Sequence, residues 1–169
     1  ALGYAEEDPT FDIEGIDAAH KLSILAAIAF GTELQFDKVS TKGISDITTE
    51  DIIHASELGY TIKHLGIAKR TGEGIELRVH PTLVPNKQLI AQVDGVMNAV
   101  MVKSDALGTS LYYGAGAGDE ATASAVIADL NDIINNQTSN HILGWKSQQK
   151  LPVIKNDDIH SEFFLRLLV

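Results

Sequence analysis

The spacing of apolar residues predicts a long helix near the start of the chain. It begins near Gly15 and stops at Gly31, the usual kind of residue for a left-handed C-terminal cap. Between them, Leu22 to Phe30 is apolar on every face of a helix. A helix that is apolar all round is expected to be buried in a protein interior. We therefore expect this helix to lie in the core.

Two further helices follow from similar patterns. The first is predicted to start at Thr48 or Thr49, either of which can be its N-cap, and to end at Leu58, before a glycine. The second is predicted over residues 119–135, with apolar residues spaced along one side. That apolar row comprises Val126, Ile127, Leu130, Ile133 and Ile134.

The middle of the chain has the pattern of strands and turns. Residues 60–70 and 75–79 are predicted strands joined by a Thr-Gly-Glu-Gly turn, and Pro81 and Pro85 are expected to end the second strand. Residues 96–103 and 109–113 are two more predicted strands, and 162–169 is another. Residues 89–93 are apolar but of undecided type. The pattern predicts an α+β fold, with a mainly antiparallel or mixed sheet and helices packed on one face.

Composition narrows the function classes. The chain has 169 residues, which is one domain's worth, and its net charge of −10 disfavours nucleic acids and anionic membranes as partners. It has no cysteine, so disulfides and thiolate chemistry are excluded, and its six histidines show no metal-binding spacing. No signal peptide is visible, and a cytoplasmic location is expected.

The first part of the chain concentrates charged side chains. Five carboxylates fall within residues 6–14, and Asp17 and Lys21 stand four apart at the head of the predicted helix, on one face. One interpretation is an exposed ion pair contributing about 0.3–0.5 kcal/mol. The other is a polar cavity with acidic groups around a lysine. The residues alone leave both open, although the first is the more common arrangement.

A glycine-rich stretch precedes the last helix. Tyr113-Gly114-Ala115-Gly116-Ala117-Gly118 leads from a predicted strand into residue 119. Such a turn can let backbone N–H groups approach a phosphate, but it has neither the dinucleotide-binding spacing nor a P-loop lysine. Close packing of a sheet end on a helix is the alternative.

Taken together, these motifs resemble the homoserine dehydrogenase family. The resemblance rests on elements at fixed spacing: Leu2-Gly3-Tyr4-Ala5-Glu6, Asp8-Pro9, Asp12-Ile13-Glu14-Gly15-Ile16-Asp17, and Lys21. It continues through His80-Pro81-Thr82, Asp94-Gly95-Val96-Met97-Asn98 and the glycine-rich stretch. The chain departs from the family at Ala115, where many relatives have proline, and at Asp119-Glu120.

The resemblance implies roles for particular residues. Lys21 would be the catalytic lysine, while Glu6, Asp12 and Asp17 would bind L-homoserine or aspartate semialdehyde. Lys21 would either transfer the proton or stabilise charge on the reacting oxygen. The glycine turn, through Gly114, Gly116 and Gly118, would contact NAD or NADP.

The resemblance also implies an organisation. Residues 1–160 would form a substrate-binding and dimerisation domain like the second domain of glyceraldehyde-3-phosphate dehydrogenase, and residues 161–169 would begin an ACT-type regulatory domain. The nucleotide-binding domain would lie in another part of a longer protein, because the chain has no Gly-x-Gly-x-x-Gly unit. We expect the longer protein to be a homodimer, and we expect this chain alone to be inactive. The rival hypothesis is a non-catalytic oligomerisation or effector-binding module with a vestigial acidic pocket.

Overall fold

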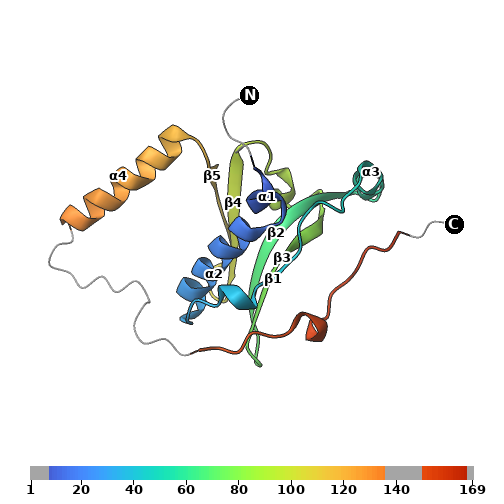
Figure 1. The fold of residues 1–169 in the computed structure, drawn as a ribbon, viewed down its shortest axis with the longest axis horizontal. Helices are drawn as coiled ribbons and strands as arrows, with labels where there is room; N and C mark the ends of the chain where they lie inside the picture. Colours follow the sequence, from blue (N-terminus) through green and yellow to red (C-terminus); the bar gives the residue numbers. More distant parts are fainter. Residues whose placement is uncertain (1–7, 136–149, 167–169) are drawn as a thin grey trace. The chain divides into compact units, whose positions relative to one another are not determined.

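The computed structural model describes residues 8–135 and 150–166. The chain divides into two compact units, of which one contains the described residues 84–135 and the other 8–83 and 150–166. Helices accompany a three-stranded sheet in the latter and a two-stranded sheet in the former (Figure 1). The predicted α+β class is therefore confirmed.

In the larger unit, the helices precede the two long strands of the sheet along the chain. It contains α1 (Thr10–Ile13), α2 (Ile16–Phe30), the short 3-10 helix η1 (Phe36–Lys38), β1 (Ser40–Thr41), α3 (Thr49–Glu57), β2 (Tyr60–Arg70) and β3 (Ile75–Pro85). The sheet order is β1-β3-β2, and β1 runs parallel to β3. The helix predicted from Gly15 to Gly31 matches α2, because both glycines adopt left-handed conformations that end the helical geometry.

The core lies between α2 and the sheet. Ala19 and Leu22 of α2 pack with Val79 of β3, and Ala26 packs with Ile75 and Leu77. All six side chains are buried. Ile75, Leu77 and Val79 alternate along β3, so one face of that strand meets the helix, as the period of two requires.

The expectation that α2 is buried on every face is wrong for this chain as described. Ile24, Leu25 and Ile28 are 44%, 44% and 49% exposed, because the sheet covers only the opposite side of the helix. The small residues Ala19, Ala26 and Ala27 occupy the buried side and let the helix approach the sheet closely. Helix α2 therefore has two apolar faces: one packs against the sheet, and the other is exposed among the described residues.

The prolines do not end β3 where the sequence predicted. The strand continues through Pro81 to Pro85. On one side of β3, β1 pairs only with Arg78 and Val79. Beyond Val79 that side has no ladder hydrogen bonds to β1, so a residue without an N–H is tolerated there.

A segment near the end of the chain completes this core. The N–H of Ile75 donates to the carbonyl of Pro152 at 2.9 Å, and the N–H of Ile154 donates to the carbonyl of Ile75 at 2.9 Å. Leu151 and Val153 pack against the cluster around Ile75. Leu151 is also held by Thr32 and Gln35, whose side chains bond its N–H at 3.1 Å and its carbonyl at 2.9 Å.

Helix α3 starts with a capping box. The Thr48 hydroxyl accepts from the Asp51 N–H at 3.2 Å, and the Asp51 carboxylate accepts from the Thr48 N–H at 2.9 Å. The carboxylate also accepts from the Thr48 hydroxyl at 2.8 Å, and the two bonds that Thr48 donates to it, the backbone bond first, lower the pKa of Asp51. Arg166 adds contacts to Glu50 at 2.9 Å and Asp51 at 3.4 Å. Its neighbours Glu162 to Leu165 form no strand, and residues 167–169 of the predicted strand lie outside the described residues.

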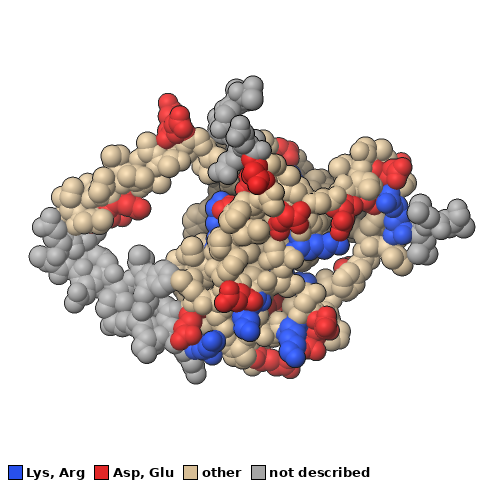
Figure 2. Space-filling model, in the orientation of Figure 1, with Lys and Arg blue, Asp and Glu red and all other residues tan. Residues whose placement is uncertain are grey.

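The smaller unit is a hairpin followed by a helix. After the 3-10 helix η2 (Leu89–Gln92), β4 (Met97–Ser104) pairs antiparallel with β5 (Gly108–Ala115), and α4 spans Asp119–Asn135. The predicted apolar row of α4 is exposed, with Ile127 at 63% and Ile133 at 67%. In Figure 2 the surface of α4 shows acidic groups and no Lys or Arg. The apolar row of α4, like the outer face of α2, is therefore exposed among the described residues.

Candidate functional site

The segment that leads into α1 and α2 begins with a hydrogen-bonded aspartate. Asp8 Oδ1 accepts hydrogen bonds from the Thr10 hydroxyl at 2.5 Å and from the Thr10 N–H at 3.1 Å. The hydroxyl bond, followed by the backbone bond, lowers the pKa of Asp8. Asp8 therefore holds the chain at the entrance to α1, which leads through Gly15 into α2.

Gly15 connects the two helices in a conformation that other residues rarely adopt. Its φ of 77° is left-handed. A Cβ at this position would lie 2.8 Å from Cε1 of His64 and 2.9 Å from Cγ1 of Val79. His64 is itself fixed, because its Nε2 lies 3.0 Å from the carbonyl oxygen of Lys42. The glycine of the Gly-x-Asp motif thus seats the head of α2 against the sheet.

The loop after β1 holds the same region from the other side. Ser45 Oγ donates to Glu14 Oε1 at 2.5 Å, and the N–H of Ile44 donates to the carbonyl of Ile13 at 3.0 Å. A Cβ on Gly43 would lie 2.6 Å from Glu14 Oε2. Glu14 therefore serves to tie the loop to α1.

Asp17 and Lys21 are brought together as the spacing predicts. Lys21 Nζ donates to Asp17 Oδ2 at 2.5 Å, and the two side chains are 67% and 40% exposed, with the larger value for Lys21. Asp12 is exposed in α1 just before this helix, and its carboxylate bonds to no described residue. Glu6 lies outside the described residues. The first two turns of α2 thus present a carboxylate and an ammonium at the surface.

The three glycines of the glycine turn differ in their surroundings. A Cβ on Gly114 would meet no heavy atom within 4 Å, whereas a Cβ on Gly116 would lie 1.5 Å from Nδ2 of Asn98. Gly118 has a left-handed φ of 109° directly before α4. Gly114 is therefore open, Gly116 is crowded by Asn98, and Gly118 has a backbone conformation that favours glycine.

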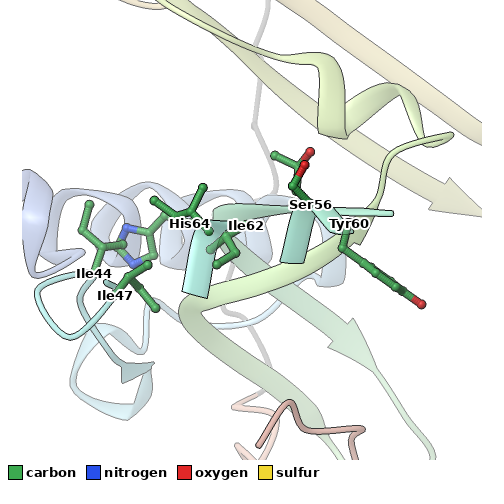
Figure 3. Close-up of a pocket in the computed structure, with 8 residues that line it drawn as sticks. Ile44, Ile47, Ser56, Tyr60, Ile62 and His64 are labelled. Carbon is green, nitrogen blue, oxygen red and sulfur yellow. The ribbon is translucent and has the colours of Figure 1, made fainter. Parts of the chain in front are cut away.

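The larger unit also contains an apolar pocket of about 450 Å³. Its lining comes from the loop after β1, from α3 and from β2: Ile44, Ile47, Ile52, Ser56, Tyr60, Thr61, Ile62 and His64. In Figure 3 the His64 ring lies beside Ile44 and Ile47, and the Tyr60 side chain points away from them. None of the residues proposed from sequence lines this pocket. The pocket and the Asp17–Lys21 pair are therefore different features of the unit.

Two residues in these arrangements were not found from the sequence. His64 supports Gly15, and Asn98 occupies the space beside Gly116. Asn98 stands in the stretch of residues 94–98 that contributes to the family resemblance, but the resemblance gave it no role, and His64 lies in no motif. Asn98 reaches Gly116 through the register of the β4–β5 hairpin, and His64 reaches Gly15 through the packing of the larger unit. The described residues hold no group of three or more His, Cys, Asp or Glu that could bind a metal. Within the same residues, no helix has both the length and the apolar character needed to cross a membrane.

These features define an α+β domain whose leading helix exposes a paired aspartate and lysine and whose hairpin ends in a glycine-rich turn. The family model for homoserine dehydrogenase matches residues 1–131. The chain belongs to the homoserine dehydrogenase family.

Individual relatives agree with this assignment. The chain is 68% identical over 139 residues to homoserine dehydrogenase of Pseudomonas aeruginosa, a match that covers 82% of this chain and 32% of that protein. It is 52% identical over 174 residues to the enzyme of Neisseria gonorrhoeae, covering 99% and 40%. The crystal structure of a homoserine dehydrogenase from Thiobacillus denitrificans superimposes with a TM-score of 0.87 at 59% identity, covering 91% of this chain and 37% of that one. The chain therefore spans well under half the length of these relatives.

Proposed function

We propose that this chain is the substrate-binding catalytic domain of a homoserine dehydrogenase. The reaction would be the NAD- or NADP-dependent interconversion of L-aspartate 4-semialdehyde and L-homoserine, which serves threonine, methionine and isoleucine biosynthesis. The observation that carries the proposal is the Asp17–Lys21 pair at the exposed head of α2, within the segment that matches the family.

The acidic residues suit the ammonium group of the substrate. Lys21 uses Oδ2 of Asp17, which leaves Oδ1 available to accept a bond from the substrate ammonium. Asp12, whose carboxylate has no partner among the described residues, and Glu6 would add further acceptors. Carboxylate oxygens accept strong charge-assisted bonds from ammonium groups, so two or three of them would fix the orientation of the amino acid.

Lys21 is the group assigned to the reacting oxygen. When the nicotinamide cofactor is bound, it supplies hydride to the aldehyde or accepts hydride from the alcohol. In the direction of reduction, the Lys21 ammonium would donate a hydrogen bond to the aldehyde oxygen, stabilise the charge that develops there and give up its proton to form the alcohol. In oxidation the lysine amine would take that proton back.

The glycine turn is assigned to the cofactor. Gly114, Gly116 and Gly118 would present backbone atoms to NAD or NADP, and open space at Gly114 supports this. We further propose that residues 1–160 act as one catalytic domain, that residues 161–169 lead into a regulatory domain, and that the protein is a cytoplasmic homodimer. Light scattering that shows a monomer would contradict the dimer.

A chimeric enzyme tests the function. All 169 residues would replace the matching segment of the Neisseria gonorrhoeae enzyme, and homoserine oxidation would be measured with NAD and with NADP. We expect an active enzyme whose kcat falls by about 10²–10⁴ in Lys21→Ala, because general acid–base and electrostatic contributions have that size.

Lys42→Ala provides the matched control, because Lys42 forms another exposed i,i+4 pair, with Asp46 at 3.8 Å. Its kcat should stay within about twofold, as expected for a surface pair. A folded but inactive chimera would overturn the proposal and favour the non-catalytic module. If the chimera does not fold, NMR titration of the 169-residue chain with L-homoserine decides instead. Chemical-shift changes at Asp17 and Lys21 would support the site, and the absence of any change there would contradict it.

A further inference from the structure

We propose that Asn98 is the positioning residue of the glycine turn, residues 114–118. Its side chain fills the place that a side chain at position 116 would need, and this packing fixes the backbone assigned to the cofactor. The inference rests on the function proposed above for that turn.

The hairpin register brings Asn98 to the turn. Asn98 pairs with Gly114, and the last ladder pair at this end of the hairpin is Met97 with Ala115. One more long bond, from the Gly116 N–H to the carbonyl of Val96 at 3.4 Å, follows beyond the ladder. The backbone from Gly116 onward is therefore held by little hydrogen bonding from β4, and side-chain packing has correspondingly more influence on it.

The contact between Asn98 and Gly116 is very close. A Cβ built on Gly116 would lie 1.5 Å from Nδ2, 2.4 Å from Cγ and 2.9 Å from Cβ of Asn98. The amide thus lies directly against the Cα of Gly116. Asn98 is exposed, so rotation of its side chain could move Nδ2 and Cγ away, but its Cβ is fixed by the backbone of β4 and would still lie 2.9 Å from a Cβ at position 116. The two positions form one packed unit across the hairpin.

Contact with Gly116 is the role that we assign to the Asn98 side chain. Its amide makes no hydrogen bond to any described residue, so it contributes no polar link within the hairpin. Asn98 and the residues around it line a hollow of about 260 Å³, namely Ala99, Val100, Tyr112, Tyr113, Gly114, Ala115 and Gly116. Removing the side chain would widen this hollow and release Gly116. The strand ladder, which is made of backbone bonds, would remain.

The test measures cofactor binding separately from catalysis. In the chimera, NADPH affinity would be measured by fluorescence titration for Asn98→Ala, for Asn98→Leu and for the control Thr109→Ala at the far end of the hairpin. We expect Asn98→Ala to raise the dissociation constant about tenfold, which corresponds to about 1.4 kcal/mol. The KM for homoserine should stay within about twofold, because the substrate groups are not touched.

The leucine variant separates packing from hydrogen bonding. Leucine has nearly the shape of asparagine without its polar atoms, so it should keep the affinity within about threefold. Equal losses in Asn98→Leu and Asn98→Ala would overturn the positioning role, as would an unchanged affinity in Asn98→Ala. An active chimera with either of these results would leave the proposed function standing and refute only this inference.

Hydrogen exchange in the 169-residue chain gives a second readout that needs no cofactor. Asn98→Ala should speed amide exchange at Gly116, whose N–H donates to the carbonyl of Val96 at 3.4 Å, while exchange in the paired residues 109–113 and in Thr109→Ala stays unchanged. Unchanged exchange at Gly116 would also contradict the inference.

Discussion

Replacing Gly15 by alanine tests how the head of α2 is held. Alanine at a φ of 77° costs about 1–2 kcal/mol, because the Cβ crowds the following carbonyl oxygen. The new Cβ would also lie 2.8 Å from His64 and 2.9 Å from Val79. Val79 is fully buried and His64 is bonded to the Lys42 carbonyl, so neither can move freely. Overpacking of this kind typically adds about 1–3 kcal/mol, which gives a total of about 2–5 kcal/mol.

Gly31 offers a matched control at the other end of the same helix. Its φ of 64° is equally left-handed, but a Cβ there would meet no heavy atom within 4 Å. Gly31→Ala should therefore cost only the backbone part, about 1–2 kcal/mol. Urea unfolding of the two variants, followed by circular dichroism, measures both free energies. If Gly15→Ala is no more destabilising than Gly31→Ala, the packing of Gly15 against His64 and Val79 does not constrain the helix as argued.

Three smaller predictions concern stability. Thr48→Val should lower the free energy of unfolding by about 1 kcal/mol in urea titrations, because it removes the side-chain cap of α3, and an unchanged midpoint would contradict the cap's role. The lowered pKa of Asp51 means that its contribution is present above the carboxyl's unfolded pKa and is lost as the pH falls through the folded value; Thr48→Val should reduce this acid dependence, and pH titration of the unfolding free energy would show it. Leu151→Ala should cost about 2–4 kcal/mol if the segment completes the core, whereas the exposed Leu165→Ala should change stability by less than about 0.5 kcal/mol in the same assay.

Local signals made much of the fold predictable. Gly15 and Gly31 mark the ends of α2, and Thr48 begins α3, because caps are determined by the few residues around them. The Asp17–Lys21 contact follows from helical spacing alone. The hairpin of β4 and β5 also follows from alternation and a short turn.

Contacts between distant residues could not be read in the same way. Whether Ile24, Leu25 and Ile28 are covered depends on what packs against α2, not on the helix itself. The passage of β3 through Pro81 depends on the short length of β1. His64 beneath Gly15 and Asn98 beside Gly116 are consequences of strand register. Each of these features depends on residues that become neighbours only in the folded structure, and the sequence pattern does not identify those residues.

The segment at residues 151–154 has a consequence for synthesis in the cell. A ribosome releases α2, β2 and β3 long before this segment, since Leu151 is 116 residues beyond its partner Gln35. Until then Ile75 has no backbone partner from Pro152, and the nearby apolar cluster lacks Leu151 and Val153. Closing so long a loop is entropically costly and slow compared with forming the helices. The nascent chain would thus pass through a stage in which the apolar cluster around Ile75 lacks part of its cover.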